Sequence, residues 1–400
     1  MSNRLKLFRE RIAAFEVTAD PSRAIDSNYY VDPPGKLPGE QISGRIALRP
    51  LSSHILIGGI GSGKTTQLLL ACQKINQIQD IHAVYVDVSL YADISQISSG
   101  VLTVIAALEL SEMLKESEDQ SLQQSITLIR KLAFGYEGSY YQQNMFDMSG
   151  IPHRKPSQIN QEGVLSDISD PYGVKSDLVK AASNLVKEAA NQYGQIVLLF
   201  DGLDRLDDVK TFMQIMAVDG KAISSMQIGL VLVGSLISLY GDYSDTVHQE
   251  IDYYYQPFFD LEHDTQAYSF FKKIIQTRSS TDFIEYPAIQ TLIYFSGGVL
   301  RDFITLTQSA IEETYLSGED KVQKKHVLSA VDSFGRSQLL GLSNDELKIL
   351  QLSLDIEKPI PRNNENLRLR IRRLILEYRS PKNRYTVHPA VKHLVERISF

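Results

Sequence analysis

Short apolar runs alternate along the chain with segments of helical spacing. Residues 54–58, 196–200 and 228–233 are mostly apolar, and such continuous runs predict strands buried on both faces of a sheet. Residues 65–75 directly follow the first run and carry leucines at helical spacing, so they predict a helix. Strands that alternate with helices are typical of α/β folds with a parallel sheet. The pattern therefore predicts an α/β core in the first part of the chain.

The later part of the chain is dominated by helical spacing. Residues 292–318 and 321–336 carry apolar side chains three and four positions apart, which predicts helices. The acidic stretch at residues 109–120 is interpreted as the solvated face of another helix. These patterns predict a helical region that follows the α/β core.

The last 60 residues suggest a small unit of their own. Residues 343–354 begin with a Ser/Asn cap and continue with helical spacing. Residues 366–378 contain a basic amphipathic helix with Leu374 on its apolar side, and residues 375–389 predict two strands joined by a turn. A helix, a basic helix and a hairpin, in this order, are typical of a winged helix.

A glycine-rich stretch lies where the first predicted strand becomes a helix. The string Gly58-x-x-x-x-Gly63-Lys64-Thr65 fits the phosphate-binding loop pattern in full. Glycines let backbone N–H groups turn toward an anion, and the following helix points its positive end at the same place. Lys64 would reach the β- and γ-phosphates, and the Thr65 hydroxyl would bind Mg²⁺. The predicted nucleotide-binding residues of this stretch are Gly58, Gly59, Gly61, Ser62, Gly63, Lys64, Thr65 and Thr66.

The second apolar run supplies the carboxylates that such a loop needs. It ends in Asp201-Gly202-Leu203-Asp204, at the carboxyl end of the predicted strand, where ligands bind in open α/β sheets. Asp201 is the predicted Walker B residue that holds Mg²⁺ together with Thr65. Asp204 is the predicted residue that orients the attacking water. The alternative is a strand followed by an ordinary Asp-Gly turn.

Composition limits the class and the compartment of the protein. The chain has 400 residues, is 43% hydrophobic and holds a single cysteine, Cys72, so it cannot form an internal disulfide. Its apolar runs are far shorter than the stretch of about 20 residues that a membrane-spanning helix needs. Its N-terminal stretch lacks the apolar segment of a secretory signal. We therefore expect a cytoplasmic protein with no membrane contact.

Charge is distributed unevenly. The net charge is −7, but residues 361–400 carry +7 and the other 360 residues carry −14. An asymmetry of this kind suggests that one end of the chain meets a polyanion.

The base is expected to be adenine. A guanine-specific protein would carry an Asn/Thr-Lys-x-Asp element, and the nearest string, at residues 174–177, lacks the leading polar residue. An ABC-type signature would precede the Walker B strand, whereas the similar string at residues 295–299 follows it. ATP and Mg²⁺ are therefore the expected ligands.

With these motifs the chain resembles the AAA+ ATPases, in particular the branch that contains the origin-recognition initiators and the STAND signalling ATPases. The resemblance implies a sensor 1 residue, Ser235, at the end of a strand that lies between the two Walker strands. It also implies a sensor 2 arginine, Arg301, in the string Gly298-Val299-Leu300-Arg301 that starts a lid helix. The alternatives are a serine cap and an arginine that pairs with Asp302. Tyr30 is expected to pack on the adenine or to belong to a plain linker.

One departure from the AAA+ pattern affects the expected rate. Many AAA+ proteins carry Glu directly after the Walker B aspartate, whereas Gly202 stands here and the second acid is Asp204. This order resembles STAND proteins and implies slow hydrolysis. Arg205 follows and is a candidate arginine finger for a neighbouring subunit, or a partner for an acid in its own subunit.

The expected architecture is an AAA+-like P-loop core with a helical lid and a C-terminal winged helix. The predicted boundaries are residues 1–50 for an N-terminal helix and adenine-side linker, 51–250 for the core with a polar insert at about 134–174, 251–336 for the lid and 337–400 for the winged helix.

Two functions remain open at this point. The first is an ATPase whose nucleotide state drives assembly, as a homo-oligomer, on duplex DNA through the basic tail or with a partner protein. The second is a slow ATP-dependent switch that signals to a separate effector without binding DNA, as in bacterial antiviral defence or mobile-element systems; that context is analogy alone.

Overall fold

The structure is a computed structural model of the 400-residue chain. It describes residues 3–16, 25, 29–134, 143–146, 152–155, 169–170, 173–206, 208–234, 236–239, 251–280, 282–354 and 364–397. The chain forms two compact units. The sheet unit holds Pro38–Ile57 and Lys64–Tyr255, and the helical unit holds Met1–Leu37, Gly58–Gly63 and Gln256–Phe400. The glycine loop thus groups with the helical unit, although the strand before it and the helix after it group with the sheet unit.

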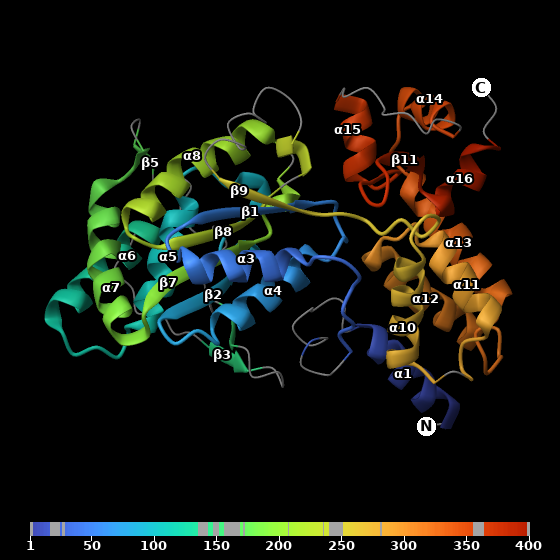
Figure 1. The fold of residues 1–400 in the computed structure, drawn as a ribbon, viewed down its shortest axis with the longest axis horizontal. Coiled ribbons are helices and arrows are strands. Elements are labelled where there is room, and N and C mark those ends of the chain that lie inside the picture. The colour runs from blue at the N-terminus through green and yellow to red at the C-terminus, as the bar shows by residue number, and fades with distance from the viewer. Residues whose placement is uncertain are drawn as a thin grey trace. The chain divides into compact units, whose positions relative to one another are not determined.

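The central sheet confirms the α/β prediction. Among the described residues it has five strands in the order β2-β7-β8-β1-β9 (Figure 1). These strands are β1 (Ser53–Gly58), β2 (Ile81–Asp87), β7 (Gln195–Asp201), β8 (Gly229–Gly234) and β9 (Asp252–Gln256). The pairs β2/β7, β7/β8 and β8/β1 are parallel. As predicted, β8 lies between the two strands that carry the Walker motifs.

Helices cover both faces of the sheet because its strands are apolar on both sides. On one face Leu56 packs with Ile42 and Leu68, which lie on α3 (Pro38–Leu48) and α4 (Lys64–Ile75). The next residue, Ile55, points to the other face, near Phe212. Phe212 lies on α8 (Val209–Ser225). The remaining long helices of this unit are α5 (Val101–Met113), α6 (Gln120–Phe134) and α7 (Ser176–Tyr193).

The acidic stretch at residues 109–120 is solvated only in its second half, where Glu116, Glu118 and Asp119 are exposed. Glu109 and Glu112 are 7% and 8% exposed, and Glu109 accepts a hydrogen bond from the hydroxyl of Tyr91. Glu112 pairs with Lys115. The prediction was wrong for the first half because α5 is packed against α6, α7 and α8 and most of its residues are buried. The short strands β3 (Gln143–Phe146), β4 (Pro152–Lys155), β5 (Ser169–Asp170) and β6 (Gly173–Val174) lie in the predicted insert, most of which is outside the described residues.

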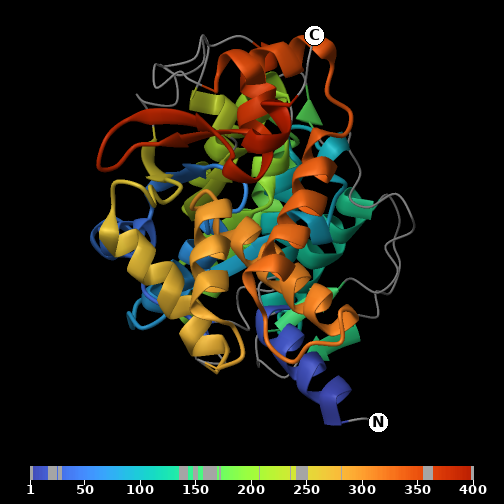
Figure 2. The same ribbon diagram turned by 90° about the vertical axis from the view of Figure 1, so that its right-hand side faces the viewer.

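The helical unit has one main core. Figure 2 shows its helices side by side, and large aromatic side chains such as Phe8, Phe271 and Phe303 fill the space between them. The helices are α1 (Asn3–Glu16), α10 (Thr265–Arg278), α11 (Tyr286–Phe295), α12 (Leu300–Leu316) and α13 (Lys324–Leu339). No helix among the described residues is long and apolar enough to cross a membrane.

The C-terminal part has a smaller core of its own, built by Leu350, Leu369, Ile375, Val391 and others. Its elements are α14 (Asn344–Leu352), α15 (Asn364–Ile371), β10 (Ile375–Tyr378), β11 (Arg384–Val387) and α16 (Pro389–Val395). The two strands form the predicted antiparallel hairpin. The predicted Ser/Asn cap at the start of α14 is confirmed with Ser343 as the cap. It is part of a capping box, in which the Ser343 and Glu346 side chains bond each other's backbone N–H groups.

The basic helix is shorter than predicted. It ends at Ile371, and Leu374 lies beyond it. Arg373 takes the left-handed conformation with φ of 62°, and the Leu374 N–H reaches back to the Leu369 carbonyl at 2.8 Å. This is a Schellman ending with arginine at the position that glycine usually takes. No glycine marks the end of this helix, so the periodic pattern predicted a helix that was too long.

Candidate functional site

The glycine loop is tight, and its glycines are required by what surrounds them. A Cβ on Gly58 would lie 2.4 Å from the Gln256 carbonyl oxygen, and one on Gly59 would lie 2.2 Å from the Phe258 ring. Gly61 and Gly63 have φ of +82° and +101°, which only glycine adopts without strain. The glycines of the loop carry no side chain of their own that would stand between their backbone N–H groups and an anion.

The start of α12 lies against this loop within the helical unit. The Arg301 N–H donates to the Gly61 carbonyl at 3.2 Å, and a Cβ on Gly63 would lie 3.2 Å from Leu300. Arg301 is the second residue of α12, as the predicted Gly-x-x-Arg element requires, and its side chain is exposed. Asp302, which the alternative interpretation pairs with Arg301, binds Arg373 through two hydrogen bonds of 2.9 Å.

The hydroxyl group of Ser62 in the loop is placed to bind an additional polar group. Ser62 is 1% exposed, and its Oγ has no hydrogen-bond partner within the described structure. A buried hydroxyl without a partner is costly, so such groups are normally satisfied by protein or by water or a ligand. The loop therefore has the shape and the unsatisfied polarity expected of a phosphate cradle.

The chemistry in the sheet unit begins at the first residue of α4. Lys64 is 4% exposed, and its Nζ lies 2.8 Å from Asp204 Oδ2. Asp204 is held in a single 3₁₀ turn, η3 (Leu203–Arg205), directly after β7. A lysine is rarely buried without a charged partner, and Asp204 provides one here. The structure thus brings together two residues that are 140 positions apart in the sequence.

Asp201, the last residue of β7, is the second carboxylate at this strand end. It is 6% exposed; its Oδ1 accepts the Gly202 N–H at 2.8 Å and its Oδ2 accepts the Tyr85 hydroxyl at 3.0 Å. The Thr65 side chain also hydrogen-bonds to it. Burial raises the pKa of Asp201 and the charge of Asp204 adds to this, whereas the hydrogen bonds from Thr65, Gly202 and Tyr85 act in the opposite direction. The predicted pair of Mg²⁺ ligands, Thr65 and Asp201, is therefore in contact.

The remaining predicted residues are less informative. Thr66 is half-buried in the first turn of α4. Tyr30 is half-buried in the helical unit, next to Tyr29, which packs on the main core there. Arg205 is exposed. Ser235 lies outside the described residues, so its sensor role stays a prediction.

The sequence reasoning missed Tyr85. This residue belongs to β2, which the motifs did not single out, and it reaches Asp201 because β2 pairs with β7 in parallel. The only available signal was a tyrosine two positions before the end of an apolar run, and it becomes meaningful only when the strand order is known.

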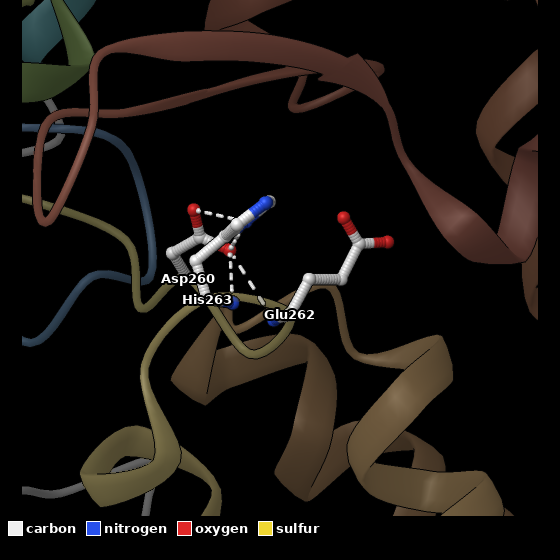
Figure 3. Close-up of side chains that lie close together, drawn as sticks. All are labelled: Asp260, Glu262 and His263. Atoms are coloured by element: carbon white, nitrogen blue, oxygen red, sulfur yellow. Dashed lines mark hydrogen bonds and ion pairs between the residues drawn. The ribbon is translucent and has the colours of Figure 1, made fainter.

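A second group of charges lies in the helical unit, after β9. Figure 3 shows Asp260, Glu262 and His263 close together, with His263 hydrogen-bonded to Asp260 at 3.2 Å. Arg384 of β11 also binds Asp260, with Nε 2.8 Å from Oδ2 and a terminal nitrogen 2.6 Å from Oδ1. The buried carboxylate is thus neutralised by an arginine, and the group ties the hairpin to the segment before α10.

The hairpin approaches the glycine loop through one layer of side chains. Phe258, whose ring meets Gly59, shares a small apolar cluster with Val299, Leu376 and Tyr378. The Tyr378 hydroxyl donates to the Gly297 carbonyl at 2.7 Å. The C-terminal hairpin therefore packs on the same residues that line the loop.

No protein-family model and no curated protein matches the chain. Several solved structures are similar to it. One is the ORC2 protein of Aeropyrum pernix in its ADPNP–ADP complexes, at 15% identity, with 94% of this chain and 96% of that chain covered and a TM-score of 0.47. Another is the Aeropyrum pernix ORC1 protein in complex with DNA, at 13% identity, 91% and 93% coverage and a TM-score of 0.43.

The Holliday junction branch migration motor RuvB of Thermotoga maritima is also similar, at 15% identity, 90% and 93% coverage and a TM-score of 0.40. At such identities these similarities concern the fold alone.

Proposed function

We propose that the chain is an AAA+-type ATPase that binds ATP and Mg²⁺ through the residues of the glycine loop, the start of α4 and the carboxylates that end β7. The observation that carries this proposal is the pairing of a buried Lys64 with Asp204, beside the contact between Thr65 and Asp201. A lysine, a hydroxyl and two carboxylates directly after a glycine loop and a buried parallel strand are the groups that a Mg²⁺–triphosphate complex requires.

Each residue has a role that follows from its chemistry. The loop N–H groups and Lys64 bind the phosphates, and Thr65 and Asp201 hold Mg²⁺, which neutralises the charge that develops on the phosphate oxygens. Asp204 orients the attacking water. Ser235, Arg301 and Tyr30 are proposed as sensor 1, sensor 2 and an adenine-side contact.

The ion pair between Lys64 and Asp204 is the state of the site before a nucleotide binds. Lys64 cannot bind phosphate and Asp204 equally well at once, so a bound triphosphate draws its ammonium away from the carboxylate. Asp204 Oδ2 then becomes able to accept a hydrogen bond from water. The water oxygen bonds to the γ-phosphorus, the bond from that phosphorus to the β,γ-bridging oxygen breaks, and the proton of the water leaves toward Asp204.

The test compares Lys64→Ala with Lys74→Ala, because both lysines lie on α4. Lys74 is exposed and pairs with Glu40 at 2.6 Å, away from the loop. We expect wild type and Lys74→Ala to bind and hydrolyse ATP in the presence of Mg²⁺ and Lys64→Ala to show neither. Equal turnover by all three proteins would contradict the proposed site.

A second feature favours the switch over assembly on DNA. Six of the nine described Lys and Arg side chains between residues 364 and 397 are engaged within the chain. These are Arg368, Arg370, Arg372, Arg373, Arg379 and Arg384. Arg368, Arg373 and Arg384 are paired with acids that lie outside the tail, namely Glu346, Asp302 and Asp260, and the other three arginines are held by Glu377 or by carbonyls. These contacts reduce the charge that the tail offers to phosphates. We therefore propose that the tail, in the order of a winged helix, responds to the nucleotide and meets a protein partner.

A gel shift with duplex DNA at low and high salt tests this choice. We expect weak binding that vanishes at the higher salt and no stimulation of ATP hydrolysis by DNA. Tight binding with a steep dependence on salt concentration, together with faster hydrolysis, would instead support assembly on DNA. Size-exclusion chromatography with and without ATP tests whether the nucleotide drives homo-oligomer formation.

A further inference from the structure

Tyr85 occupies a special place beside the proposed metal ligand Asp201. It lies on β2, two residues before the strand ends at Asp87, and the parallel register places Asp87 opposite Asp201. From this position its hydroxyl donates to Asp201 Oδ2 at 3.0 Å. The ring is half-buried and packs against the apolar core between the sheet, α3 and α4.

Both oxygens of the Asp201 carboxylate are engaged by donors from the sheet unit. Oδ1 accepts the Gly202 N–H and Oδ2 accepts the Tyr85 hydroxyl. Rotation of the carboxylate about its last side-chain bond would break both hydrogen bonds. The two donors therefore restrict the carboxylate to one orientation and leave it lone pairs that still point away from them.

We infer that Tyr85 is a positioning residue that holds the Asp201 carboxylate in the orientation in which it receives Mg²⁺ or a water bound to Mg²⁺. This inference rests on the proposed nucleotide site and names a residue that the phosphate-loop and Walker motifs do not contain. Partners that orient a metal ligand matter because a ligand free to rotate must be ordered when the metal binds.

The alternative is that Tyr85 only fills space in the core. Tyr85→Phe separates the two roles, because it keeps the ring in the core and removes only the hydroxyl. Tyr91→Phe is the matched control. Tyr91 lies in the same unit and also donates to a buried carboxylate, Glu109, which is not part of the proposed site.

The measurement is the affinity for ATP by calorimetry, once with Mg²⁺ and once with EDTA. For Tyr85→Phe we expect the Kd of Mg²⁺–ATP to rise about tenfold or more, while the Kd of metal-free ATP stays as in wild type. Tyr91→Phe should leave both affinities unchanged. Equal Kd values for Tyr85→Phe and wild type under both conditions would overturn the inference, as would an equal loss under both.

A double-mutant cycle guards against a general folding effect. Asp201→Asn should itself weaken the dependence of ATP affinity on Mg²⁺, and adding Tyr85→Phe should then change it no further. A full additional loss in the double variant would show that Tyr85 acts elsewhere. Failure of wild type to bind ATP under either condition would be a different result, because it would reject the proposed nucleotide site itself.

Discussion

Two buried aspartates of the sheet unit and two of the helical unit are stabilised in opposite ways. In the sheet unit, Asp219 is fully buried and accepts hydrogen bonds from the Gly100 and Thr103 N–H groups and the Thr103 hydroxyl, with no arginine or lysine partner in the described structure. Asp201 likewise relies on N–H and O–H donors. In the helical unit, Asp260 and Asp302 each form an ion pair with an arginine from the C-terminal part of the chain.

The pKa directions follow this difference. Burial raises the pKa of Asp201, and it raises that of Asp219 to about 6, because neutral donors do not fully replace water. Burial acts in the same direction on Asp260 and Asp302, but Arg384 with His263, and His388 with Arg373, outweigh it and lower both pKa values. A buried carboxylate without a cation can still bind one, whereas a carboxylate paired with arginine already has its counter-charge. This difference supports the proposal that Asp201 binds a metal, whereas Asp260, despite its neighbours Glu262 and His263, is already part of an ion pair with Arg384.

The largest expected effect comes from breaking an arginine pair in the helical unit. Asp302→Ala leaves the half-buried Arg373 and the buried His388 without their carboxylate. Removal of one partner of a buried pair costs about 3–5 kcal/mol of the free energy of unfolding. Urea unfolding monitored by circular dichroism measures the change.

Asp332→Ala is the control for this prediction, because Asp332 pairs with Arg336 on the exposed face of α13. Exposed pairs contribute little, so its unfolding curve should nearly coincide with that of wild type. Equal curves for Asp302→Ala and Asp332→Ala would show that the Asp302 pair does not stabilise the unit and would remove the contrast between the two kinds of carboxylate.

The sequence was most informative where function fixes residue types at short spacing. Gly58 to Thr65 and Asp201 to Asp204 are each contiguous, and each follows an apolar strand, so both could be located without coordinates. The motifs also predicted that Thr65 and Asp201 act together. That Lys64 binds Asp204 could not be predicted, because it depends on the strand order, in which β8 separates β1 from β7.

The C-terminal part shows the opposite case. Its charge could be counted, but the partners of Arg373 and Arg384 lie 71 and 124 residues earlier in the chain. No local sequence pattern relates such distant positions. The sequence therefore could not show which arginines form ion pairs within the protein and which could contact DNA. The end of α15 at Ile371 could not be predicted for a related reason. Arg373 adopts a positive φ without the glycine that normally signals it, and its side chain is held by Asp302.

The smaller expected effect concerns pH and the carboxylates of the sheet unit. Asp219 has its pKa raised to about 6, so the folded chain binds this proton more tightly than the unfolded chain. Its contribution to stability is therefore fully present below about pH 4 and is lost as the pH rises through about 6, by about 3 kcal/mol at about 1.4 kcal/mol per pKa unit. Asp260 and Asp302 act in the opposite sense, because their lowered pKa values make stability fall when the pH drops below the ordinary range of a carboxyl group.

Asp219→Asn isolates the first effect, since asparagine does not titrate. We expect the difference in unfolding free energy between wild type and Asp219→Asn to shift against wild type between about pH 4 and about pH 7 and to stay constant above that range. Urea titrations at a series of pH values measure this difference. Parallel pH profiles for the two proteins would mean that the hydrogen bonds from Gly100 and Thr103 compensate the burial of Asp219 fully. Neutral donors would then stabilise a buried carboxylate as well as an arginine does, and the distinction between Asp201 and Asp302 would have to lie in access to the ligand rather than in charge.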